Sequence, residues 1–119
     1  HADMLEYLAQ HAEHERNRKI YELGARLQMR KIQALADAHE SAVKEFRQAL
    51  QQLHSQGYQI DMNDPLRGTA ANPQLVEKIN AEYSRISARL ANRTRSICEY
   101  YLKNGPEMIQ GMMEEQDKQ

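Results

Sequence analysis

The chain has 119 residues, which is enough for one domain with a modest core. Its formal net charge is −1, and this argues against a dedicated polyanion-binding protein, because such domains are usually strongly basic. The sequence has one Phe, no Trp and no run of about 18 apolar residues, so we expect a core of Leu, Ile, Ala and Met and no membrane span.

The first predicted helix runs from about residue 3 to about residue 55, because helix-forming residues continue throughout and Pro is absent from this stretch. It begins with an apolar cluster of Met4, Leu5, Tyr7 and Leu8, and residues 9–19 are then almost wholly polar. A second apolar stripe follows. It lies at a different angle around the helix from the stripe that residues 25–53 form. Gly24 lies where the two stripes meet, and we expect a bend or a break there.

Residues 25–53 show the clearest amphipathic pattern in the chain. With Ile32 as position a of a heptad, nine of the ten residues at positions a, d and e are apolar, and His39 is the exception. Three apolar positions in seven form the broad stripe of a bundle helix. The ten residues are Ile32, Leu35, Ala36, His39, Ala42, Val43, Phe46, Ala49, Leu50 and Leu53.

Residues 57–72 are predicted to form an ordered loop. Gly57 is suited to end the first helix, and turn-forming residues without periodicity follow it. The loop is long for a connection between helices, so we expect it to pack on the helices and to be a place to look for function. The side chains available for packing are Tyr58, Ile60, Met62 and Leu66.

Asn72 and Pro73 predict the start of a second helix over residues 73–103, with Asn as the N-cap and Pro in the first turn. Asn104, Gly105 and Pro106 predict its end. A short third helix is expected over residues 106–115, with an apolar face made of Met108, Ile109, Met112 and Met113. Cys98 is the only cysteine, which fits a reducing compartment and a cytoplasmic protein.

Folding the second helix antiparallel on the first pairs residues whose numbers sum to about 128, so Tyr83 comes near Ala42 to Phe46 and Asn104 near Gly24. Residues 3–23 then project roughly 30 Å beyond the second helix. A polar helix alone is marginal in water, so we expect a second copy or a partner to cover its apolar side chains. The predicted partner or dimer interface contains Met4, Leu5, Leu8, Ile20, Leu23, Leu27, Met108, Ile109, Met112 and Met113.

Arginine and lysine residues on both helices offer an alternative, a belt for polyanion binding. Its candidate residues are Arg26, Arg30, Lys31, Arg85, Arg89, Arg93 and Arg95. In the hairpin, however, Asp37 and Glu40 come close to Arg93, which lies at a d position. An ion-pair network is therefore the favoured use of these charges, with Arg93 requiring a carboxylate partner.

Histidines give the remaining alternative, a metal or phosphate sensor. His11, His14 and Glu15 share one helical face, but a metal site needs three or four converging ligands. His39 is expected at the edge of the apolar stripe. Because no catalytic motif is present, we expect no catalytic residues, no metal and no cofactor, and thus no enzymatic activity.

The sequence therefore predicts an all-α protein. It is expected to be a long antiparallel, coiled-coil-like helical hairpin with a short third helix, forming a homodimeric helical bundle. The predicted function is a non-enzymatic protein–protein interaction module, such as an adaptor, assembly factor, chaperone or regulator, that binds a helical partner. The alternative is a nucleic-acid-associated regulator that uses the Arg and Lys belt.

Overall fold

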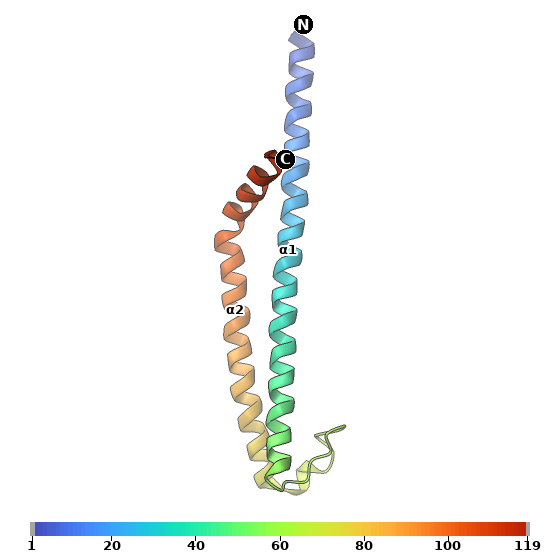
Figure 1. Cartoon of the computed structure of the whole chain (residues 1–119), viewed down its shortest axis with the longest axis vertical. Coiled ribbons are helices and arrows are strands. Elements are labelled where there is room, and N and C mark those ends of the chain that lie inside the picture. Colours follow the sequence, from blue (N-terminus) through green and yellow to red (C-terminus); the bar gives the residue numbers. More distant parts are fainter. Residues whose placement is uncertain (1, 119) are drawn as a thin grey trace. The chain divides into compact units, whose positions relative to one another are not determined.

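The computed structural model describes residues 2–118, and the elements in this range are all helical (Figure 1). They are α1 (Ala2–Ser55), a short 3-10 helix η1 (Thr69–Ala71) and α2 (Pro73–Asp117). The described residues contain no strand, so the all-α prediction is confirmed. None of these helices is long and apolar enough to cross a membrane. The chain divides into two compact units, His1–Ala34 with Ile97–Gln119, and Leu35–Ser96.

The second unit, Leu35–Ser96, is an antiparallel helical hairpin. Its core lies near the loop and consists of buried aliphatic side chains from both helices and from the loop. Further along the hairpin, the rings of Phe46 and Tyr83 meet edge to face, with their centroids 6.1 Å apart. This contact confirms the predicted pairing of Tyr83 with the stretch from Ala42 to Phe46. The core residues are Leu50, Leu53, Ile60, Leu75 and Ile79.

The end of α1 is fixed by backbone hydrogen bonds around Gly57, which has a φ of +103°. The Gly57 N–H donates to the carbonyl of His54 (3.0 Å), and the Tyr58 N–H donates to the carbonyl of Leu53 (3.2 Å). This pair of bonds is the Schellman arrangement, in which a glycine in the left-handed region closes a helix. The predicted role of Gly57 is confirmed, and the turn places Tyr58 against the core.

The loop packs on the hairpin largely as predicted. Tyr58, Ile60 and Met62 belong to the core or lie against it. Leu66, however, is 77% exposed, so its predicted packing role is wrong. The contact of Leu66 with the rest of the loop is made by its backbone: its carbonyl accepts a hydrogen bond from the hydroxyl of the buried Thr69 (3.1 Å).

Asn72 caps α2, as the sequence predicted. Its side-chain Oδ1 accepts a hydrogen bond from the Leu75 N–H at 3.3 Å, and its carbonyl accepts one from the Val76 N–H at 3.1 Å. The cap therefore orients the first turn of α2 so that Leu75 enters the core.

The first unit pairs the N-terminal part of α1 with the C-terminal part of α2. Leu23 and Leu27 are buried, and Gly105 lies against Leu27 so closely that a Cβ on this glycine would be 3.5 Å from Leu27 Cδ2. Residues 2–14 are all exposed, and in Figure 1 these blue turns extend past the end of α2. The uncovered stretch is thus shorter than the predicted residues 3–23, because Ile20 is half-buried and Leu23 is buried. The expected bend or break at Gly24 is not a break, because α1 continues through it.

The predicted third helix is wrong as a separate element, because α2 continues through Pro106 to Asp117. Proline removes one helical hydrogen bond, the one that residue 106 would donate to the carbonyl of Leu102, and it crowds the preceding turn. Leu102 is 81% exposed, so water can satisfy its carbonyl. Figure 1 shows α2 bending in this region, so Pro106 kinks the helix and does not end it.

Replacing Leu75 with Ala is expected to lower the free energy of unfolding by about 2–5 kcal/mol, because Leu75 is only 2% exposed within the core. Leu102→Ala is the matched control and should change it by no more than about 0.5 kcal/mol. Urea titration followed by circular dichroism measures both. Equal effects of the two variants would contradict the placement of the core.

Two glycines should respond to alanine in opposite directions. Gly24→Ala is expected to stabilise the protein by about 0.4–1 kcal/mol, since Gly24 is helical and its new Cβ meets nothing within 4 Å. Gly57→Ala is expected to destabilise it by more than about 1 kcal/mol, because its φ of +103° disfavours a side chain. The same urea titration compares them, and stabilisation by both would argue against the left-handed end of α1.

Candidate functional site

The seam between the helices of the second unit has small side chains at its middle. Ala38 is buried there and Ala42 is half-buried, whereas the core near the loop contains leucine and isoleucine. Alanine cannot fill the space that a leucine would occupy, so a groove opens on each face of the hairpin. Ala42, Ile86 and Leu90 line both grooves and form the layer between them.

One groove, here called the apolar groove, has a volume of about 260 Å³. Val43 and Tyr83 rise at its edges and are 46% and 60% exposed, although both are large apolar side chains. Phe46 is half-buried between them. Such a depression is suited to an apolar side chain from another molecule. The complete lining is His39, Ala42, Val43, Phe46, Tyr83, Ile86, Ser87 and Leu90.

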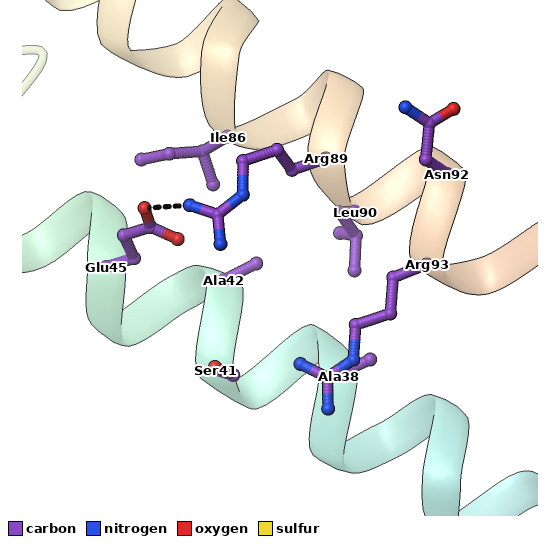
Figure 2. Close-up of a pocket in the computed structure, with 9 residues that line it drawn as sticks. All are labelled: Ala38, Ser41, Ala42, Glu45, Ile86, Arg89, Leu90, Asn92 and Arg93. Carbon is purple, nitrogen blue, oxygen red and sulfur yellow. Dashed lines mark hydrogen bonds and ion pairs between the residues drawn. The ribbon is translucent and has the colours of Figure 1, made fainter. Parts of the chain in front are cut away.

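The other groove, here called the charged groove, has a volume of about 250 Å³ and lies around Glu45, Arg89 and Arg93 (Figure 2). Glu45 Oε1 accepts hydrogen bonds from Arg85 Nη1 at 3.0 Å and from Arg89 Nη1 at 2.6 Å. Figure 2 shows the Arg93 side chain reaching across the groove towards Ala38. The full lining is Ala38, Ser41, Ala42, Glu45, Ile86, Arg89, Leu90, Asn92 and Arg93.

The ion pairs across the seam lower the pKa of Glu45. The hydrogen bond from Arg85 is the largest cause of this shift, and the positive charge of Arg89 adds to it. The pKa of Arg85 is raised in turn by its hydrogen bonds to Glu82 and Glu45. These side chains are partly exposed, so their attraction is screened by water and salt. Glu45 links the two helices but contributes modestly to stability.

The residues of the predicted basic belt differ in their contacts and in their exposure to solvent. Arg85 and Arg89 both bind Glu45, which reduces the positive charge that they offer to a polyanion. Arg93 and Arg95 are exposed on α2 in the second unit. In the first unit, Arg26 and Arg30 are exposed and Lys31 is half-buried.

The predicted partner of Arg93 was a carboxylate from Asp37 or Glu40. Arg85 and Arg89 form ion pairs across the seam with a different acidic residue, Glu45. Sequence reasoning missed Glu45 because it lies one position outside the a, d and e stripe. The signal available was the pair Arg85 and Arg89, one helical turn apart and opposite Glu45 in the predicted hairpin.

The predicted partner interface divides into covered and open parts. Leu23 and Leu27 are buried within the first unit and are not available to a partner. Ile20 and the Met-rich face of α2, made of Met108, Ile109, Met112 and Met113, are half-buried. Met112 borders a depression together with Leu23, Arg26 and Arg30. Met4, Leu5 and Leu8 are exposed by 52–69%.

The histidine group near the N-terminus has other contacts. The ring of His11 stacks on Tyr7 with their centroids 6.3 Å apart, and Glu15 binds Arg18 at 2.9 Å. The hydrogen bond from Arg18 is the main cause that lowers the pKa of Glu15. Within residues 2–118, no three His, Cys, Asp or Glu side chains come together as a metal site requires.

Glu45→Gln is expected to lower the melting temperature at neutral pH, because the neutral amide loses both charged partners. Folding lowers the pKa of Glu45, so its contribution is complete above its ordinary pKa of about 4.3 and disappears as the pH falls below about 4. Melting curves of wild type and variant from pH 7 to pH 3 should therefore converge at the acidic end. Glu99→Gln is the control, because Glu99 is exposed and lines neither groove, and it should show no such convergence. A constant difference across the pH range would refute the role of the ionised carboxylate.

Comparisons with known proteins gave no match to this chain. No protein-family model, no curated protein and no solved structure was found to be similar to it. The two grooves and the exposed N-terminal turns of α1 are thus the features that define the candidate site.

Proposed function

We propose that this protein is a non-enzymatic interaction module that forms a homodimeric helical bundle through the apolar groove. The observation that carries the proposal is the exposure of Val43 and Tyr83 beside the half-buried ring of Phe46. Apolar side chains grouped around a depression are typical of a surface that another protein covers.

The balance of buried and exposed side chains supports association. Among the described residues, nine apolar residues are buried, whereas twelve large apolar side chains are exposed. A folded monomer of this length normally buries most of its large apolar side chains, because the hydrophobic effect is its main source of stability. A second layer of helices over the apolar groove would supply the missing burial.

The N-terminal turns of α1 are suited to a further helical partner. Met4, Leu5 and Leu8 lie along one side of the helix, and each is more than half exposed. Helices recognise one another through apolar residues at this spacing. This segment therefore supports the role of an adaptor or assembly factor, with dimerisation and partner binding assigned to different parts of the chain.

Light scattering after gel filtration tests the dimer. We expect twice the chain mass for wild type, and we expect Val43→Glu to raise the dimer dissociation constant by at least about 100-fold, because it places an unpaired charge in the apolar groove. Val43 is 46% exposed, so the variant should still fold, which circular dichroism can check.

Leu102→Glu is the matched control, since Leu102 is an exposed apolar residue of the first unit, outside the apolar groove. It should leave the dissociation constant unchanged. A wild-type chain that stays monomeric at all concentrations would reject the proposal. A dimer that is equally insensitive to both substitutions would place the interface on another surface.

A further inference from the structure

Two opposite charges lie along the outer edge of the apolar groove on α1. Glu40 and Arg47 are both exposed, and neither makes an ion pair within the described part of the chain. They are seven residues apart, so they lie nearly one above the other on the same face of the helix. They flank Val43, a groove residue, three positions before it and four positions after it, so all three side chains lie on one face of α1. Val43 with Glu40 and Arg47 on either side of it forms a ridge on α1, here called the apolar ridge, which has a negative end at Glu40 and a positive end at Arg47.

This arrangement is complementary to itself. When two copies of α1 meet at this ridge in opposite directions about a two-fold axis, Glu40 of each copy approaches Arg47 of the other. When they meet in the same direction, Glu40 approaches Glu40 and Arg47 approaches Arg47, which is repulsive. Charge complementarity thus distinguishes the two arrangements.

We infer that the occupant of the apolar groove is a second copy of this chain, docked antiparallel on α1, with Glu40 and Arg47 of one copy paired with Arg47 and Glu40 of the other. This inference rests on the proposed function and adds the direction and the specificity of the contact. Val43 lies midway between the two charges along the ridge, so it packs near the two-fold axis. The flanking charges do not drive association by themselves. They select the antiparallel direction, as charges beside a coiled-coil seam do.

Charge exchange in the full chain tests the inference. Glu40→Arg and Arg47→Glu each turn two attractive pairs of the antiparallel dimer into two repulsive ones. Each should raise the dimer dissociation constant by at least about tenfold at low salt and by less at high salt. The double variant Glu40→Arg with Arg47→Glu restores both pairs in exchanged positions, and its dissociation constant should return to near the wild-type value. Sedimentation equilibrium over a dilution series measures all four proteins.

Arg95→Glu is the matched control for Arg47→Glu, because it makes the same change of charge at an exposed position of the second unit outside the apolar groove. It should leave the dissociation constant unchanged, and circular dichroism should show the same helix content for every variant. Weakening by the single variants together with restoration by the double variant supports the antiparallel arrangement.

Three other results would overturn the inference. A dimer that Val43→Glu disrupts but that none of the charge variants alters would preserve the proposed function and reject the antiparallel pairing. Single variants that weaken the dimer without restoration by the double variant would show that the two residues are not partners. A monomeric wild type would reject both the inference and the proposed function.

Discussion

A helix with a broad apolar stripe cannot bury all of it against one neighbouring helix, and this geometric limit governs the second unit. Contact between two helices covers a narrow seam, whereas the apolar stripe of α1 occupies three positions in every seven. On α1, the residues buried in this seam include Ala38, Leu50 and Leu53. The other edge of the stripe, which includes Val43, is left at the surface. Apolar exposure here is thus a consequence of having only two helices in the unit.

The size of the seam residues determines where the hairpin is tight and where it is open. Near the loop, leucine and isoleucine from both helices interlock, and the cap of Asn72 and the turn at Gly57 hold the helix ends in place. At the middle, Ala38 and Ala42 leave a groove on each face. The two grooves differ in chemistry, because one contains Glu45 and its arginines and the other contains aromatic and aliphatic side chains.

The sequence was sufficient to predict the two long helices, their ends near the loop and their antiparallel pairing, because the hydrophobic periodicity, Gly57 and the Asn72–Pro73 cap act locally. It failed at Pro106, where a signal that usually ends a helix instead bends one. Solvent at Leu102 makes the lost hydrogen bond tolerable, and the contact between Gly105 and Leu27 comes from tertiary packing.

The heptad pattern did not predict the grooves or the role of Glu45, since both depend on which edge of the broad stripe faces α2. A heptad frame assigns residues to a stripe but does not say which part of the stripe a single neighbour will cover. Leu66 illustrates the same limit in the loop, where the Thr69 hydroxyl donates a hydrogen bond to the Leu66 carbonyl while the apolar side chain of Leu66 stays exposed.

The shared oxygen of Glu45 has a consequence for how the two helices hold their alignment. Arg85 and Arg89 both donate to Glu45 Oε1, and they are separated by about one helical turn along α2. A displacement of α2 by one turn, about 5.4 Å, would still leave this carboxylate with an arginine beside it. The ion pair therefore holds the helices together without selecting a single axial position. The axial position of α2 is instead fixed by the interlocked side chains around Leu75 and by the short turn at Gly57. The alignment of the two helices is therefore set at the loop end of the hairpin, and the middle of the hairpin takes the same alignment.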